Sequence, residues 1–253
     1  MEYKEKIVVF LDILGFKNAV DKSIADPTYV DKIYKIVHRI FDGKKQNDNG
    51  PLEMKSHDLQ ISTFSDSLVI SYPTTKSNAL PFVIMHIIWT MFDLLYSGFV
   101  ARGGISVGQL YHDGDVIFGP AMNEAYYLES NCAIYPRIII SKATIDHCLA
   151  ISKKIDQAND IESWLHKILS IDKDGFYFVD FLSQSDEFDD DDIYMEWLWK
   201  VKEVIENGLK GSKNSEKLFA KYVWLADYYN TTLKQFNTIP ECCPTSINIP
   251  LSF

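Results

Sequence analysis

An uninterrupted apolar run near the N-terminus constrains the fold more than any other feature of the chain. Residues 6–11 read Lys-Ile-Val-Val-Phe-Leu and are rich in β-branched side chains. A strand of this composition is covered on both faces, so we expect it at the centre of a sheet. Asp12-Ile13-Leu14-Gly15 follows, and the glycine allows a tight exit from the strand. The sequence therefore predicts a central strand that ends on a carboxylate.

Strand and helix patterns alternate along residues 1–150, in an order that defines a fold class. The order is strand, helix, strand, strand, helix, strand, strand, and it predicts an α+β protein with a ferredoxin-like core over residues 1–150. After the central strand, the predicted elements are a helix over 29–41, a hairpin over 58–72 that turns at Ser65-Asp66, a helix over 81–97, strands over 100–110 and 115–118, a helix over 121–130, a strand over 137–140 and a helix over 142–150.

The most apolar stretch of the chain is a candidate for a core helix or a membrane span. It runs from Ala79 to Val100 and is interrupted by Pro81, His86 and Asp93. A proline and two ionisable side chains favour a helix buried in a soluble core, and we expect no membrane partner.

Residues 151–253 differ in character from the first part of the chain. Aromatic residues at helical spacing predict helices over 193–209 and 215–236, and six acids in the seven residues 186–192 predict a solvated loop. We therefore expect residues 151–253 to form a mainly helical C-terminal extension that packs on the core.

Charge and cysteine usage exclude some function classes. The formal net charge is −10, and duplex nucleic-acid binders normally carry a basic surface. The four cysteines have no metal-ligand spacing, and we expect the adjacent Cys242 and Cys243 to be free thiols of a reducing cytoplasm. The short apolar run at the N-terminus is flanked by acids, unlike a signal peptide. These patterns predict a cytoplasmic protein.

Two carboxylates have positions that point to chemistry. Asp12 ends the central strand and Asp66 lies in the hairpin turn, so a ferredoxin-like sheet brings them to the same end. Paired carboxylates in such a place are ligands for hard divalent cations. Turn and cap roles also explain an aspartate at a strand end and are the commoner ones, and from the two residues alone both interpretations stay open.

Longer motifs resemble one enzyme family. Residues 102–108 (Arg-Gly-Gly-Ile-Ser-Val-Gly) and 119–130 (Gly-Pro-Ala-Met-Asn-Glu-Ala-Tyr-Tyr-Leu-Glu-Ser) resemble the second half of class III nucleotidyl cyclases. The segments FLDILGF and STFSDSLVISY resemble the two metal-aspartate motifs of the first half. The resemblance covers about residues 6–140, with the motifs in the family's order.

This resemblance implies a metal-dependent active site between two subunits. Asp12, Asp66 and the backbone carbonyl of Ile13 would bind two ions, Mn²⁺ or Mg²⁺. Asn123 would position the ribose from the other chain of a homodimer. The implied substrate is a nucleoside triphosphate.

Departures from the family pattern indicate which nucleotide base the protein would recognise. Tyr127 stands where typical members carry a transition-state arginine, so Arg102 and Arg137 are candidates for the cationic role. Ser62 stands where purine cyclases read the base. In this respect the chain is similar to the pyrimidine cyclases of bacterial anti-phage Pycsar systems. With Ser62, Asn123 and Arg137, the expected substrate-binding residues include Phe16 and Phe64.

The resulting hypothesis is a uridylate cyclase that converts UTP to 3′,5′-cyclic UMP and pyrophosphate as a signal in anti-phage defence. One alternative is a cytidylate cyclase, since nothing in the sequence separates recognition of uracil from that of cytosine. Another is a catalytically silent nucleotide-binding regulator, which Tyr127 favours and the two aspartates oppose. A third is an adenylate or guanylate cyclase with unusual base contacts.

Overall fold

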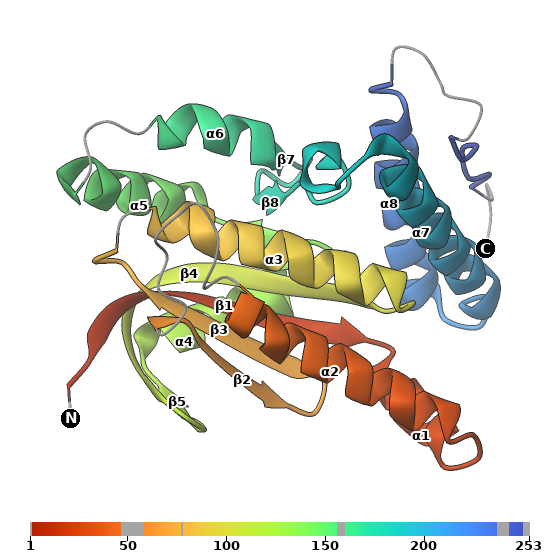
Figure 1. Cartoon of the computed structure of the whole chain (residues 1–253), viewed down its shortest axis with the longest axis horizontal. Coiled ribbons are helices and arrows are strands. Elements are labelled where there is room, and N and C mark those ends of the chain that lie inside the picture. The colour runs from red at the N-terminus through yellow and green to blue at the C-terminus, as the bar shows by residue number, and fades with distance from the viewer. Residues whose placement is uncertain (1, 47–57, 77, 156–159, 237–242, 250–253) are drawn as a thin grey trace.

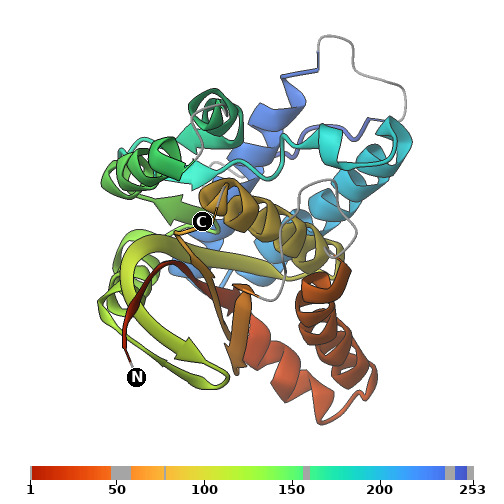
Figure 2. The same ribbon diagram turned by 60° about the vertical axis from the view of Figure 1, so that its left-hand side comes forward.

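A computed structural model describes residues 2–46, 58–76, 78–155, 160–236 and 243–249, with the backbone alone for 39–46. Cys242 lies outside these residues, and Cys132 and Cys148 are free thiols. Figures 1 and 2 show one twisted sheet with helices on both faces.

The central strand of the sheet is the predicted apolar run. β1 (Lys4–Leu14) pairs antiparallel with β3 (Ser67–Pro73) on one side and with β4 (Val100–Asp113) on the other. Side chains of successive β1 residues alternate between two core clusters, since Ile7 and Val9 belong to one and Val8 and Phe10 to the other. Burial on both faces explains why the sequence lacks polar alternation here.

The predicted ferredoxin-like core is confirmed. The strand order is β2-β3-β1-β4-β6-β8-β7, and its first four strands, with β2 at Gln60–Phe64, are the ferredoxin-like set. All three pairings among these four strands are antiparallel. Helices α1 (Phe16–Ser23) and α2 (Thr28–Gln46) connect β1 to β2, and α3 (Ala79–Tyr96) connects β3 to β4. The predicted order of elements is therefore observed, except that the sequence did not predict α1.

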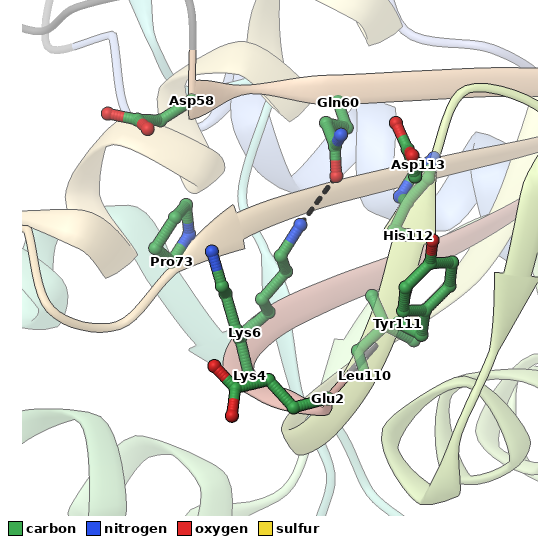
Figure 3. A pocket seen from close by; sticks show the side chains of 10 residues that line it. All are labelled: Glu2, Lys4, Lys6, Asp58, Gln60, Pro73, Leu110, Tyr111, His112 and Asp113. Carbon is green, nitrogen blue, oxygen red and sulfur yellow. Dashed lines mark hydrogen bonds between the residues drawn. The ribbon is translucent and has the colours of Figure 1, made fainter.

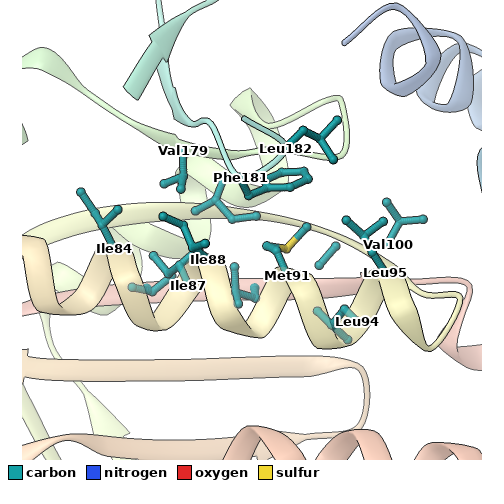
Figure 4. Packing of buried hydrophobic residues seen from close by; sticks show 14 of the residues in the cluster. Ile84, Ile87, Ile88, Met91, Leu94, Leu95, Val100, Val179, Phe181 and Leu182 are labelled. Carbon is teal, nitrogen blue, oxygen red and sulfur yellow. The ribbon is translucent and has the colours of Figure 1, made fainter. Parts of the chain in front are cut away.

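Helix α3 is the predicted buried helix. It is long and apolar enough to cross a membrane by length and composition, yet two thirds of it is buried within the protein. Figure 4 shows Val179, Phe181 and Leu182 packed above it, from a segment far along the chain. His86 lies inside this packing, where burial lowers its pKa to about 4. The imidazole is therefore neutral at pH 7 and is a core side chain.

Helix α4 (Pro120–Tyr127) packs on the opposite face of the sheet and continues into a π-helical turn, η3 (Leu128–Cys132). The short strand β5 (Val116–Phe118) precedes it and pairs with the end of β4. Figure 1 shows α4 and α3 on opposite sides of the sheet. The predicted helix over 121–130 thus changes geometry at its end, and π-turns of this kind frequently occur at functional sites.

The sheet continues beyond the predicted boundary at residue 150. That residue lies inside α5 (Lys142–Ile155), which follows β6 (Ile138–Ile140). After α6 (Ile161–Ile168), β7 (Leu169–Ile171) and β8 (Tyr177–Val179) join the same sheet through β6. Two helices complete the chain, α7 (Asp191–Gly211) and α8 (Glu216–Leu233). The C-terminal region therefore contributes helices α6, α7 and α8, and its strands β7 and β8 extend the core sheet.

The acidic run includes the start of α7. Asp190 caps this helix by accepting a hydrogen bond from the Ile193 amide at 2.8 Å, and Asp191 and Asp192 occupy its first turn. Negative charge is favourable at a helix N-terminus, so part of the run has a structural role beyond a solvated loop.

Close packing of α4 on the sheet depends on Gly104. A Cβ atom at this position would lie 2.5 Å from Leu128 Cβ and 2.7 Å from the Ala125 carbonyl oxygen. We expect Gly104→Ala to lower the free energy of unfolding by roughly 1–3 kcal/mol through overpacking. The matched control is Gly211→Ala, where no atom lies within 4 Å of the added Cβ, and we expect no loss of stability. Urea unfolding of both variants tests this, and equal stability would contradict the packing described for α4.

Candidate active site

The two predicted metal ligands lie at one end of the sheet. Asp12 is paired in register with Ser67 of β3, the residue that directly follows Asp66. The Ile13 amide donates a hydrogen bond to the Asp66 carbonyl oxygen at 2.8 Å. Ser65, with φ of 58°, makes the two-residue turn that places Asp66 there. Strand register and this backbone bond bring Asp12, Ile13 and Asp66 together.

Arg102 is the cation of this group. It lies directly opposite Asp12 on β4, and its Nε is 3.2 Å from Asp12 Oδ2. Its Nη2 lies 2.7 Å from Glu129 Oε1 in an ion pair, and its Nη1 donates to the Ala133 carbonyl oxygen at 3.3 Å. One guanidinium group thus joins the end of β1 to the π-helical turn after α4.

Glu129 and Lys221 extend this charged cluster. The Glu129 side chain is almost fully buried, and burial raises its pKa. Lys221 comes from α8 and is half-buried, and burial together with the positive charge of Arg102 lowers its pKa. The negative charges of Asp12 and Glu129 act on it in the opposite direction. Two cations and two acids therefore interact at the sheet end that carries Asp12.

The helix that follows Asp12 adds backbone donors. Gly15 has a φ of 80°, in the left-handed region that favours glycine, and α1 begins at the next residue. The first amides of a helix have no partner within the helix and form a favourable site for anions. The side chain of Phe16 is buried in the main core, so this residue faces away from solvent.

Asn123 and Tyr127 lie on the outer face of α4. They are one turn apart, and both side chains are exposed. Phe64, at the tip of the β2–β3 hairpin, is 84% exposed. The structure thus directs these three predicted residues to solvent, where a second molecule could meet them.

Ser62 is held by two partners on the neighbouring hairpin. Its hydroxyl donates to the Gly114 carbonyl oxygen at 2.7 Å and lies 2.9 Å from His112 Nε2. His112 also lines a pocket of about 310 Å³ at the opposite end of the sheet from Asp12. Figure 3 shows Lys6 and Gln60 joined by a hydrogen bond across this pocket.

Arg137 is remote from the solvent and has its own partners. The side chain is completely buried, and its Nη1 and Nη2 form ion pairs with Asp172 and Asp174. The guanidinium also lies over the rings of Tyr135 and Trp224. Of the two predicted arginines, the structure brings only Arg102 to the aspartates.

Sequence reasoning missed Glu129, Lys221 and His112 as members of polar clusters. Glu129 lies in the 119–130 motif, and a single acid on a helix gives no sign of the strand arginine that it faces. The position of Lys221 depends on how α8 packs, which periodicity does not reveal. His112 could have been flagged only as a polar residue close to the predicted turn.

The residues at the sheet end fit a divalent metal ion. Two carboxylates and a peptide carbonyl are hard oxygen donors, the type that Mg²⁺ and Mn²⁺ prefer. The site has only two carboxylates, and within the described part of the chain no group of three or more His, Cys, Asp or Glu side chains is placed to hold a metal ion. Such a site would leave coordination positions for water and for substrate phosphates.

Comparison with known proteins gives structural likenesses only. No protein-family model and no curated protein matches the chain. Among solved structures, a bacterial light-regulated adenylyl cyclase aligns at 18% identity with a TM-score of 0.41, over 58% of this chain and 46% of that one. An adenylate/guanylate cyclase/hydrolase from Silicibacter pomeroyi aligns at 18% identity with a TM-score of 0.40, over 71% of this chain and 96% of that one. The chain thus spans less than half of the first of these structures, and any activity has to be argued from the residues of the site.

The burial of Arg137 predicts a structural role that can be measured. Arg137→Met leaves Asp172 and Asp174 without their cation, and we expect a loss of roughly 3–5 kcal/mol in the free energy of unfolding. Lys142→Met is the matched control, because Lys142 forms an exposed ion pair with Asp146, and exposed pairs contribute little to stability. Thermal unfolding compares the two variants. An Arg137→Met protein as stable as the control would show that the buried ion pairs are dispensable.

Proposed function

We propose that this protein is a nucleotidyl cyclase specific for a pyrimidine triphosphate, with UTP as the substrate. The observation that carries the proposal is the juxtaposition of Asp12, Ile13 and Asp66 by strand register and a backbone hydrogen bond. The sequence motifs that resemble class III cyclases contain these same residues. Membership in anti-phage signalling is part of the proposal and follows from the resemblance to pyrimidine cyclases.

The reaction forms one bond and breaks another at the α-phosphorus. The ribose 3′-oxygen attacks this atom, the bond to the bridging oxygen of the β-phosphate breaks, and pyrophosphate leaves. The hydroxyl proton is lost to solvent or to a basic group. Mn²⁺ or Mg²⁺ bound by Asp12, Asp66 and the Ile13 carbonyl would supply charge neutralisation and lower the pKa of the attacking hydroxyl.

The residues around the aspartates match a triphosphate in charge. Unpaired amides at the start of α1 can donate to phosphate oxygens. Arg102, already beside Asp12, offers a planar guanidinium with several donors, which suits phosphate recognition. Positive charge placed where negative charge develops stabilises the transition state, and Arg102 is our candidate for this role.

The exposed residues of α4 support a site completed by a second copy of the chain. Asn123 and Tyr127 are exposed on α4 of the single chain, where a second copy could meet them. A homodimer with twofold symmetry would bring Asn123 of one protomer to the aspartates of the other and build two equivalent sites. Orientation of the ribose in this way removes part of the entropic barrier to ring closure.

A catalytically silent regulator is the second candidate function. Tyr127 cannot carry positive charge, and Arg102 is already paired with Asp12 and Glu129. A protein of this kind would bind a nucleotide and release no pyrophosphate.

The substrate test uses the purified protein with Mn²⁺ and each of UTP, CTP, ATP and GTP, followed by mass analysis of the products. We expect 3′,5′-cyclic UMP and pyrophosphate, with UTP preferred over ATP and GTP by at least about tenfold, or about 1.4 kcal/mol. Preferred turnover of CTP would make the protein a cytidylate cyclase. Faster turnover of a purine triphosphate contradicts the pyrimidine assignment, and nucleotide binding without any product supports the silent regulator.

The metal ligands can be tested by removing one carboxylate. We expect Asp66→Ala to lose Mn²⁺ binding and cyclase activity while its melting temperature stays close to that of the wild type, because Asp66 lies in a turn outside the core. Asp227→Ala, which removes an exposed carboxylate on α8, is the matched control and should retain both properties. Calorimetric Mn²⁺ titration and the product assay provide independent readouts. Activity of Asp66→Ala within tenfold of the wild type would remove Asp66 from the site.

Sharing of the site between protomers predicts complementation. Asp12→Ala and Asn123→Ala should each be inactive alone. Mixing them should restore up to about one quarter of wild-type activity, since half of the dimers formed by free exchange are mixed and each mixed dimer keeps one intact site. Subunit exchange is followed by native mass spectrometry of a tagged and an untagged protein. Exchange without recovered activity would mean that the site is built within one chain.

A further inference from the structure

The hydroxyl of Ser62 has a fixed direction of donation. Its oxygen lies 2.7 Å from the Gly114 carbonyl oxygen and 2.9 Å from His112 Nε2. A carbonyl oxygen can only accept, so the single hydroxyl proton of Ser62 goes to Gly114. Toward His112 the Ser62 oxygen must then accept, and the ring proton of His112 is assigned to Nε2.

The contact on the other side of the imidazole agrees with this direction. In a neutral imidazole with its proton on Nε2, Nδ1 accepts, and Ser71 Oγ lies 2.8 Å from it. The Ser71 hydroxyl therefore donates to His112. Its oxygen is 3.5 Å from Lys6 Nζ, and the same ammonium donates to Gln60 Oε1 at 2.5 Å. An ammonium group has donors and no acceptor.

These bonds form one chain whose two ends cannot be reversed. It runs from Lys6 through Ser71 and His112 to Ser62 and ends on Gly114, and we call it the polar chain. It begins on a group that can only donate and ends on a group that can only accept. Lys6, Ser71 and His112 are all more than nine-tenths buried. Reorientation of any member would leave a buried polar group without its partner, which is costly.

The polar chain ties four strands together at the predicted base position. Lys6 lies on β1, Ser71 on β3, His112 on β4 and Ser62 on β2. Gln60 of β2 and Ser71 of β3 are direct register partners, so the backbone pairing of these two strands lies beside the polar chain. With its proton committed to Gly114 and one lone pair to His112, the Ser62 oxygen has only acceptor capacity left for a ligand.

We propose that His112 is a positioning residue for base selection, which holds Ser62 as a hydrogen-bond acceptor for an N–H group on the edge of the pyrimidine. This inference rests on the proposed function, because it assigns Ser62 to the base subsite. Uracil offers N3–H and cytosine offers its 4-amino group, and both satisfy an acceptor. A base that presents a lone pair at this point is rejected, since two acceptors then face each other. The polar chain thus determines which edge of the base can bind.

The first test concerns the proton and needs no activity. Long-range ¹H–¹⁵N spectra of the histidine side chains, with the His112 signals assigned by their loss in His112→Gln, report which nitrogen carries the proton. We expect the Nε2–H tautomer at pH 8. The Nδ1–H tautomer would reverse the polarity of the polar chain and overturn the proposal.

The second test concerns selection of the base. We compare kcat/KM for UTP and for N3-methyl-UTP, which lacks the N3–H group, in the wild type, His112→Phe and His112→Gln. The wild type should prefer UTP by at least tenfold. His112→Phe should reduce this ratio at least fivefold, mainly through a higher KM for UTP. His112→Gln has an amide N–H that can still donate to Ser62, so we expect it to keep most of the preference. His147→Gln, an exposed histidine on α5, is the control and should match the wild type.

Additional measurements separate a failure of the proposed role of His112 from a failure of the proposed function. If the enzyme prefers CTP, the pair compared is CTP and N4,N4-dimethyl-CTP. If His112→Phe does not fold, Ser62→Ala replaces it and should show the same loss of preference. A folded variant with wild-type selectivity overturns the role of His112 and leaves the cyclase assignment intact. A wild type that neither turns over UTP or CTP nor binds their α,β-methylene analogues in calorimetry overturns the proposed function, and the base-reading role fails with it.

Discussion

The burial of β1 on both faces and its pairing along both edges determine where Asp12, Asp66 and Arg102 lie. Its register with β4 places Asp12 opposite Arg102, and its register with β3 places Asp12 opposite Ser67. A shift of one residue would turn Asp12 into the core and expose an apolar side chain, so burial specifies this register strongly. The positions of the candidate metal ligands, of Arg102 and of the hairpin turn all follow from that one constraint.

The charged cluster around Arg102 links elements that are distant in the sequence. The guanidinium group reaches a strand-terminal acid, Asp12, and a nearly buried acid, Glu129, at 3.2 and 2.7 Å. The π-helical turn carries Glu129 directly after the exposed helix face that would meet a partner. Lys221 brings α8 into the same electrostatic environment. The C-terminal helices thus contribute charge to the site end of the sheet in addition to covering the core.

The sequence predicted the core well because its signals were local. The apolar run, the hairpin turn at Ser65-Asp66 and the helical spacing of α2 are each short-range patterns, and their order determined the topology. Short elements with few distinctive residues were not predicted, such as α6, β7 and β8. Their place depends on pairing with β6, which is a tertiary interaction.

In the candidate site, too, local sequence patterns could be predicted and tertiary interactions could not. Asp12 and Asp66 could be found because strand ends are marked by turn residues, and their proximity follows from topology. Arg102 is partly exposed and Arg137 is completely buried. Nothing in the sequence distinguishes the two arginines in this respect. The hydrogen bonds that hold Ser62 come from strands far apart in the chain, so their direction could be assigned only once the distances were known.

A crystal structure with Mn²⁺ and α,β-methylene-UTP, recorded at a wavelength where manganese scatters anomalously, tests the central claim most directly. We expect anomalous peaks about 2.1 Å from carboxylate oxygens of Asp12 and Asp66, with Asn123 of the partner protomer facing the ribose. Manganese bound away from both aspartates, or a nucleotide held within a single chain, would contradict it.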